Sequence, residues 1–359
     1  MTAPTGDDEQ DPLEVRTARQ SFTDALAGCT TGAVTSEAQL SALQRTIVQA
    51  AMLAPSIHNS QPWRFTGDEG GLDLFADGAR RLPVLDPDGR LVHLSCGAAL
   101  LNARVAARAL GLGAASTLLP DPVDPGHLAR LELTSGVPSR PEDLALASAI
   151  LRRRTHRDAF EQRPVSPELL DELRTAAEEQ GAALVVVSGD ELIELEVLLA
   201  CADGLEEADP AYRAETTASV RTAYSPDGIP AAALADDPER GSSLRLRDFA
   251  FVGPRPSGGE PPLAEKPDVV LITADGDGPL PSLRAGQALE AVLLHAADHG
   301  VMGQPLGQAT DLPAGRVRLR TALGLVGTPQ MALRLGYATT AEPTPRRPVA
   351  DVLTGGSVE

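Results

Sequence analysis

The sequence predicts an α+β protein made of two similar halves. Two long alanine-rich segments, starting at Ser95 and at Arg284, align without a gap, and each predicts a buried helix that opens and closes on a glycine. A strand-like segment follows each one, LARLELTSG in the first half and MALRLGYAT in the second. Upstream, Ser36 and Ser166 each precede an amphipathic helical pattern and are expected to act as its N-cap. Elements that recur in the same order favour a duplicated unit.

The two alignments also locate an insertion. The two long helices are 189 residues apart in the sequence, and the two upstream helices are 130 residues apart. The second half therefore carries 189 − 130 = 59 extra residues between its upstream helix and its long helix. We place this surplus at about residues 205–265, a stretch rich in Pro, Gly and Asp for which we expect irregular structure. An insertion of this length in a compact unit is typical of a lid, a binding loop or a disordered excursion.

The resulting division has three parts. Residues 1–35 form a flexible acidic lead-in, residues 36–140 the first half, and residues 141–359 the second half with the lid-like insertion. The halves differ where a site would lie. In the first half, the upstream helix is followed by the polar loop APSIHNSQPW. In the second half, the corresponding helix is followed directly by the strand ALVVVSGD. Only the second half contains RRRTHRDAF. This division predicts one composite site between the halves.

Composition excludes several kinds of partner. The formal net charge of −19 argues against nucleic acid or an anionic membrane as the main partner. No apolar run approaches the roughly 20 residues of a membrane helix, and the acidic N-terminus lacks the pattern of a secretory signal. The 3 cysteines are odd in number and have no metal-ligand spacing. We therefore expect a cytoplasmic protein.

The loop at residues 54–63 is the first candidate site. Its prolines and Trp63 could simply mark a helix end and the start of a strand that fills the core. That interpretation does not explain Ser56, Asn59 and Gln61 together. Such a row can present several hydrogen-bonding groups to a planar heterocycle.

Two arginine clusters form the second candidate. Arg153, Thr155 and Arg157 alternate, so in an extended segment they point to one side and can hold a phosphate and the polar edge of a ligand. The alternative is a helix C-terminus, where cations complement the macrodipole. Near the end of the chain, Arg346 and Arg347 lie between two prolines.

These motifs together resemble the nitroreductase superfamily, whose members bind FMN at a dimer interface. RRTHR at residues 153–157 and APSIHNSQPW at residues 54–63 match its two hallmark segments, which come from different subunits. The chain is similar, more narrowly, to actinobacterial Acg-type members, which fuse two halves in one chain. The resemblance covers roughly residues 36–355. It implies a nitroreductase-like fold in which the fused halves form an intramolecular pseudo-dimer with one FMN.

The resemblance also implies roles for individual residues. Arg153 and Thr155 match groups that hold the FMN phosphate and ribityl chain, and Arg157 matches the cation at the pyrimidine edge. The residues that the resemblance places at the cofactor are Pro55, Ser56, His58, Asn59, Gln61, Arg153, Thr155, Arg157, Pro305, Leu306, Gly336, Arg346 and Arg347. Whether His58 touches the flavin or only caps the loop stays open. No side chain is assigned a catalytic role, because the flavin carries the hydride chemistry.

Two functions follow as expectations. In the first, NAD(P)H reduces FMN, which passes electrons to a nitroaromatic, quinone or similar small acceptor. In the second, the insertion covers the flavin, and the chain is a flavin-sequestering or stress-related protein with little or no reductase activity. A flavin-free interaction scaffold is a third, weaker alternative. The chain would act as a monomeric pseudo-dimer or pair further as a homodimer.

Two remaining patterns are given structural interpretations. His295 and His299 have a spacing that can bind a metal, but Ala296 follows the first and no third ligand is evident, so no metal is expected. Cys96 lies in a predicted helix, where close packing explains it better than a reactive thiolate.

Overall fold

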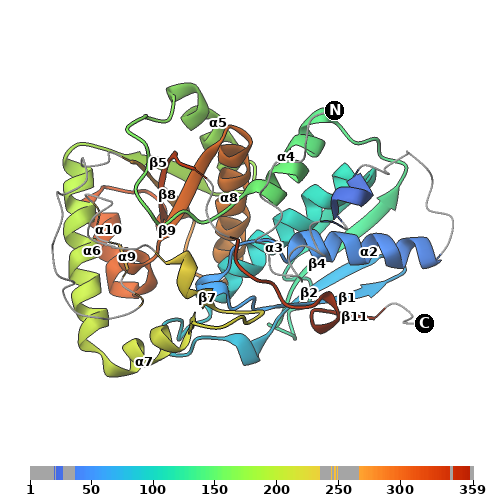
Figure 1. Ribbon diagram of the computed structural model, residues 1–359, viewed down its shortest axis with the longest axis horizontal. Coiled ribbons are helices and arrows are strands. Elements are labelled where there is room, and N and C mark those ends of the chain that lie inside the picture. Colours follow the sequence, from blue (N-terminus) through green and yellow to red (C-terminus); the bar gives the residue numbers. More distant parts are fainter. Residues whose placement is uncertain are drawn as a thin grey trace.

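The computed structural model describes residues 22–26, 37–234, 267–339 and 343–355, together with Gln20, Leu244, Leu246, Arg247 and Phe249. Figure 1 shows two groups of strands and helices side by side, with helices α3 and α8 between them. Each group contains one of the two larger sheets.

The two sheets have the same strand order. The first runs β11-β1-β2-β4-β3 and the second β5-β8-β10-β9, so β1, β2, β4 and β3 correspond to β5, β8, β10 and β9. All pairings are antiparallel except that of the added strand β11, which is parallel to β1. The strands are β1 Trp63–Asp68, β2 Gly71–Ala76, β3 Leu112–Leu118, β4 His127–Ser135, β5 Ala183–Val187, β8 Asp268–Ala274, β9 Val301–Leu306, β10 Thr328–Tyr337 and β11 Leu353–Thr354. The strand-like tails predicted in each half are confirmed as β4 and β10.

The helices repeat in the same way. The described helices are α2 Glu37–Ala51, α3 Arg90–Ala109, α4 Pro141–Arg152, α5 Pro167–Glu178, α6 Asp190–Ala208, α7 Pro210–Ala218, α8 Pro279–Asp298, α9 Gln308–Asp311 and α10 Pro313–Ala322. The amphipathic helices predicted upstream are α2 and α5. Ser166 caps α5 by accepting a hydrogen bond from the Leu169 amide, as predicted, whereas Ser36 lies outside the described residues.

Helices α3 and α8 form the contact between the halves. Each has 20 residues, and both their first and last residues are 189 positions apart, so the predicted buried helices are confirmed. The glycines predicted to open them, Gly97 and Gly286, instead lie inside. A Cβ atom on Gly97 would lie 2.2 Å from the Leu283 carbonyl oxygen, and one on Gly286 would lie 2.1 Å from that of Leu94. These glycines therefore allow two backbones to approach, rather than starting a helix.

The closing glycines are confirmed. Gly111 and Gly300 follow the ends of α3 and α8 with φ angles of 78° and 74°. This left-handed conformation ends a helix at low cost when the residue has no Cβ.

The second sheet is covered on both faces. Along β8, Val270 and Ile272 pack toward α5 and α8, while Val269 and Leu271 pack toward α6, α9 and α10. This explains the continuous apolar run of β8, because both sets of alternating side chains are buried. The first sheet packs one face on α2 and α3, where Trp63 is fully buried, as predicted.

The insertion accounts for the extra layer on the second sheet. The β1–β2 connection is residues 69–70, whereas the β5–β8 connection runs from residue 188 to residue 267. It begins before the predicted residue 205, and its first part is helical, because α6 buries Leu195 and Leu199 against the sheet. It continues through α7 and the short strands β6 Val220–Arg221 and β7 Ile229–Pro230. Residues 235–243 and 250–266 of the predicted insertion lie outside the described residues.

Described segments near both termini contact the first half. Phe22, which lies in the predicted lead-in, is fully buried in the core of the first half. At the other end, residues 343–355 return from the second half and finish as β11 on the first sheet (Figure 1). Within the parts of the chain that the structure describes, no helix is long and apolar enough to cross a membrane.

Candidate functional site

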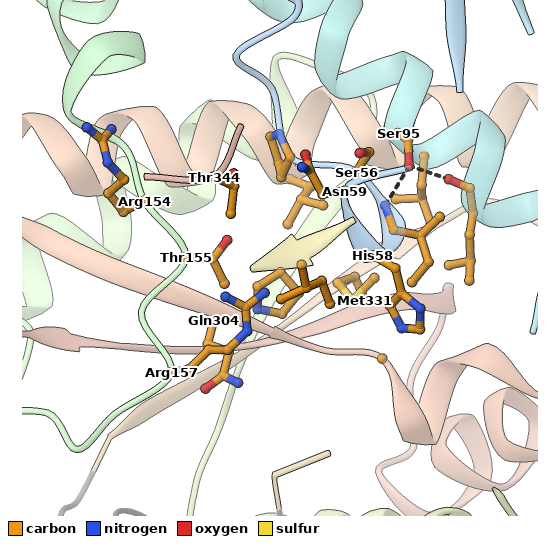
Figure 2. Close-up of a pocket in the computed structure, with 18 of the residues that line it drawn as sticks. Ser56, His58, Asn59, Ser95, Arg154, Thr155, Arg157, Gln304, Met331 and Thr344 are labelled. Atoms are coloured by element: carbon orange, nitrogen blue, oxygen red, sulfur yellow. Dashed lines mark hydrogen bonds between the residues drawn. The ribbon is translucent and has the colours of Figure 1, made fainter. Parts of the chain in front are cut away.

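One pocket lies where the two halves meet, and Figure 2 shows it. Ser56, His58, Asn59 and Ser95 reach it from the first half, and Arg154, Thr155, Arg157 and Gln304 reach it from the second. Ten of the predicted residues line this pocket: Pro55, Ser56, His58, Asn59, Arg153, Thr155, Arg157, Pro305, Leu306 and Arg346. The tertiary structure thus brings together segments that are about 100 to 290 residues apart in the sequence.

Three predicted residues lie outside the pocket. Gln61 is fully buried, donates to the Pro226 carbonyl and accepts from the Arg347 amide. Arg347 donates to the Gln61 and Asp351 carbonyls. Gly336, in β10, lies under the Phe160 ring, which a Cβ atom would approach to 2.5 Å. Their surroundings indicate roles in holding the segments that line the pocket.

The first-half loop has an unusual backbone. His58, Asn59 and Gln61 have φ angles of 46°, 53° and 51°. Each non-glycine residue in this left-handed region costs on the order of 1 kcal/mol or more, and such strain is concentrated at binding and active sites. The prolines of the loop suggested rigidity, but no local pattern predicted three left-handed residues.

Hydrogen bonds from distant segments hold this loop. The Asn59 amide donates to the Gly228 carbonyl at 2.9 Å and the Pro345 carbonyl at 3.0 Å, and its oxygen accepts from Arg346 at 3.1 Å. The Arg346 guanidinium also donates to the carbonyls of Met52, Leu53 and Ala54. It thereby satisfies acceptors at the C-terminal end of α2, which a helix leaves unpaired. Arg346 acts here mainly as a structural clamp.

The arginine segment is extended, as the alternation predicted. Thr155 forms a parallel bridge with Gly303 of β9, and the His156 amide donates to the Gly303 carbonyl. Arg153 and Arg157 line the pocket with Thr155, whereas His156 is buried against Phe160. The helix-end interpretation also holds, because α4 ends at Arg152.

Arg153 is the most informative side chain of the segment. It is 7% exposed and donates through Nη2 to the Leu53 carbonyl at 3.2 Å. Its Nε lies 3.5 Å from the buried Glu290 carboxylate, and its buried Nη1 has no hydrogen-bond partner among the described residues. An unpartnered buried guanidinium nitrogen is costly, and an anionic ligand would satisfy it.

The pocket as a whole is positively charged. In a chain of net charge −19, the described residues that line it include five arginines and no carboxylate. Burial lowers the pKa of Arg157 to about 10, as expected for a cation with little charge compensation. The remaining wall is largely apolar, with Leu91, Leu94, Ile150, Leu289 and Met331. Apolar walls and convergent cations suit a flat ligand that carries an anionic group.

Several lining residues were not predicted. Gln304 of β9 faces the pocket beside Arg157 (Figure 2), and its amide oxygen accepts from Arg334 at 2.5 Å, so its NH2 group is directed elsewhere. Gln304 begins the segment QPLGQ, residues 304–308, directly before the predicted Pro305 and Leu306, and this position could have signalled it. Ser95 begins the first of the two aligned helical segments, but nothing in the sequence assigns it or Arg247 to the pocket.

The insertion supplies one side of the pocket. Arg157 donates to the Ala233 carbonyl at 3.0 Å, and the Phe249 ring lies 5.2 Å from that of His58. Arg247 contributes another lining side chain and is held by carboxylates of Asp311 at 2.7 Å and Glu206 at 3.0 Å. The lid-like segment therefore contacts both the strained loop and the arginine segment.

His58 makes its polar contacts with the insertion. Its Nδ1 lies 3.2 Å from the Ser219 hydroxyl and its Nε2 lies 3.5 Å from Arg247. Burial and the nearby arginine cations lower the pKa of His58 well below its usual value. The ring is therefore neutral at neutral pH, and it lines the pocket while joining loop to insertion.

Cys96 and the histidine pair on α8 have partners within the protein. Cys96 is fully buried, its thiol contacts the Pro62 carbonyl at 3.3 Å, and burial raises its pKa. His295 and His299 both lie within ion-pair distance of Glu172. Among the described residues, no group of three or more His, Cys, Asp or Glu side chains is arranged to hold a metal.

Fold and pocket together define a protein with a repeated α+β core and an arginine-lined pocket between its halves. Residues 150–337 match the Nitroreductase family. In Mycobacterium tuberculosis H37Rv, the protein named "Putative NAD(P)H nitroreductase Rv3131" is 35% identical over 318 residues, which cover 86% of this chain and 90% of that protein. The protein named "Putative NAD(P)H nitroreductase acg" is 33% identical over 313 residues, covering 86% and 94%. The chain belongs to the nitroreductase family.

Solved structures align over a smaller part. A nitroreductase with bound FMN from Desulfitobacterium hafniense is 17% identical, with 60% of this chain and 98% of that chain covered and a TM-score of 0.38. An NADPH:FMN oxidoreductase from Vibrio harveyi, complexed with NAD+, is 15% identical over 60% and 78%, with a TM-score of 0.35.

Proposed function

We propose that the chain is an FMN-binding oxidoreductase that holds one flavin between two fused halves and uses NAD(P)H to reduce a small acceptor. The observation that carries this proposal is the pocket between the halves, where the described lining residues bring arginines, and no carboxylate, to an apolar cleft. Family membership supports it, because proteins named NAD(P)H nitroreductases are similar over most of the chain.

The residues present fit FMN. Arg153, with its unpartnered Nη1, and Thr155 would hold the phosphate and the adjoining hydroxyls. Arg157 and the Gln304 NH2 group would donate to the polar edge of the ring system, and the leucines and Met331 would pack on its faces. Pro55 and Ser56 from the strained loop, and Pro305 and Leu306 from β9, would line the remaining side.

When bound, FMN supplies the hydride chemistry, and the protein supplies position and electrostatics. Arg157 is buried and cationic, so it favours negative charge at the edge of the ring that it faces. Arg346 and Asn59 fix the loop, which keeps the cofactor-facing groups in place. We propose a nitroaromatic or quinone-type compound as the acceptor, because a flat aromatic molecule fits between apolar walls.

A second candidate is a flavin-sequestering protein. The contacts of Ala233 with Arg157 and of Phe249 with His58 favour it, because they place the insertion against the pocket. If these contacts persist with FMN bound, a nicotinamide ring cannot reach the flavin.

Two measurements test these functions. Purified protein should be yellow or take up added FMN with one site per chain, and a colourless protein that takes up none would refute both. Anaerobic mixing of the FMN-loaded protein with NADPH or NADH then separates them. Rapid bleaching at 450 nm supports the reductase, and absence of bleaching with either nicotinamide supports sequestration. A Phe249→Ala variant, which removes the contact of the insertion with His58, should bleach faster than wild type only in the second case.

A further inference from the structure

A buried carboxylate lies behind the arginine that we assign to the phosphate. Glu290 is in the middle of α8, is 0% exposed, and does not line the pocket. Neither of its oxygens accepts a hydrogen bond from the described residues. Its nearest cation is Arg153, whose Nε lies 3.5 Å from Oε1 and whose guanidinium lines the pocket. Arg153 therefore lies between this carboxylate and the ligand position.

Such a group is costly to keep. A buried carboxylate loses its hydration, and Arg153 at 3.5 Å together with the Asn102 side chain offsets only part of the loss. Glutamine or leucine would fit a helix–helix contact at lower cost. The first half has Leu101 at the position 189 residues earlier, where α3 makes the corresponding contact. A charge present at one of two equivalent positions, directly behind an arginine that lines the pocket, indicates a role in that pocket.

The groups that face Glu290 come from three elements. Arg153 approaches from the end of α4, Asn102 from α3, and Arg346 from the C-terminal segment. Burial outweighs these neighbours and raises the pKa of Glu290 to about 7. Its charge can therefore respond to a change at Arg153 near neutral pH.

We propose that Glu290 is the counter-ion of Arg153 in the empty pocket and that it takes up one proton from solvent when a phosphate-bearing ligand binds. In the empty pocket the carboxylate neutralises Arg153. The phosphate replaces it as the anionic partner, and a carboxylate left charged behind the same guanidinium would repel the phosphate. Protonation to the neutral carboxylic acid removes that repulsion, so binding and proton uptake are coupled.

This inference rests on the proposed FMN site, and it names Glu290 as a positioning residue. If Glu290 takes up a proton on binding, the affinity of the protein for ligands with a phosphate depends on pH. Between pH 7.0 and 8.5 the FMN phosphate is already a dianion, since its second pKa is about 6. Arg157 remains protonated there, because its pKa is about 10. Glu290 is then the group near the phosphate that changes charge in this range.

The test is FMN titration of the protein freed of bound flavin, at pH 7.0, 7.75 and 8.5. Wild type should lose affinity as pH rises, by up to about tenfold per pH unit, which is the limit for uptake of one proton. Glu290→Gln should bind FMN within about twofold across the range, and more tightly than wild type at pH 8.5. Riboflavin, which lacks the phosphate, should bind wild type without this slope. Calorimetry in two buffers of different ionisation enthalpy should show proton uptake on FMN binding that Glu290→Gln lacks.

Each outcome decides the matter. An equal slope for wild type and Glu290→Gln, or no proton uptake by wild type, overturns the role of Glu290 while leaving the FMN site intact. No FMN binding by wild type at any pH overturns the proposed function and this inference together. Glu172→Gln on α5, the same chemical change at a partly exposed carboxylate, is the matched control and should keep the wild-type slope. If Glu290→Gln does not fold, the calorimetric proton uptake of wild type still tests the proposal.

Discussion

The two halves are nearly equivalent in their cores and different at the site between them. Strand order, and the starts and ends of α3 and α8, repeat with little change. The close contacts are reciprocal: Gly97 lies against the Leu283 carbonyl, and Gly286 lies against that of Leu94. A reciprocal contact of equivalent residues is the mark of a two-fold interface. We infer that the fused halves form a pseudo-dimer.

At the site, the equivalence ends. The first half supplies a strained polar loop, and the second half supplies the arginines, the insertion and the returning C-terminal segment. The close approach of α3 and α8 needs both glycines, because each one meets a carbonyl of the other helix. One composite site needs only one loop and one cationic segment. The comparison therefore explains how the core can stay symmetric while the site does not.

Breaking the reciprocal contact between α3 and α8 should lower the stability of the protein more than any other change. A methyl group at Gly286 would overlap the Leu94 carbonyl oxygen at 2.1 Å, inside two helices that cannot shift independently. Gly286→Ala should lower the free energy of unfolding by about 3 kcal/mol or more, and Gly97→Ala should have a similar effect. Urea denaturation measures both.

The control for these variants is Gly204→Ala in α6, where an added Cβ would meet nothing within 4 Å. It should be neutral or stabilise the protein by about 0.5–1 kcal/mol, as usual for a helix interior. Unequal effects at Gly97 and Gly286, with one of them harmless, would contradict the reciprocal interface.

The C-terminal arginine pair tests the link between the halves. Arg346 donates to carbonyls at the end of α2 and to Asn59. Arg347, which is also buried, donates to the carbonyls of Gln61 and Asp351 and lies 3.7 Å from the Asp77 carboxylate. Arg346→Ala should lower the free energy of unfolding by about 2–4 kcal/mol, because buried carbonyls lose their donor. Arg347→Ala should cost about 1 kcal/mol. The same denaturation experiment compares the two, and equal losses would show that Arg346 is not the clamp.

Arg153 tests the asymmetric site. Arg153→Ala should weaken FMN binding by about 2–3 kcal/mol, which is roughly 30- to 150-fold, because charge-assisted bonds to a phosphate are lost. Riboflavin affinity should change much less, because riboflavin has no phosphate. Fluorescence titration of both ligands distinguishes the cases. An unchanged FMN affinity would remove Arg153 from the phosphate site.

The smallest expected effect is the dependence of the free energy of unfolding on pH. Burial raises the pKa of Glu290 and of Glu206, both in the second half, to about 7. The folded state then binds protons that the unfolded state has already lost, so stability falls as pH rises from about 4.5 to about 7. Urea unfolding at pH 5.5 and 8.0 should differ by about 1–3 kcal/mol, with the lower pH more stable, and Glu290→Gln should reduce the difference. A rise in stability over this range would contradict the assignment.

Much of the site could be predicted from the sequence because its segments carry strong local patterns. Alternation in RRTHR placed Arg153, Thr155 and Arg157 on one side, and all three line the pocket, but so does Arg154. The adjacent arginines near the C-terminus look alike in sequence but separate in space: Arg346 turns toward the end of α2 and Arg347 toward Gln61 and Asp351. Local pattern cannot tell them apart, because the partners Leu53 and Gln61 are about 290 positions away.

The sequence by itself determined the α+β class, the duplication, the helices and the contributing segments, because periodicity and turn chemistry act over a few residues. Only the tertiary structure decided that Gly97 and Gly286 allow two helices to meet, that the loop holds three left-handed residues, and that Glu290 lies behind Arg153. Each of these depends on distant chain segments being packed together. Close approach, strain and burial arise only from that packing, and they set the charge and shape of the pocket.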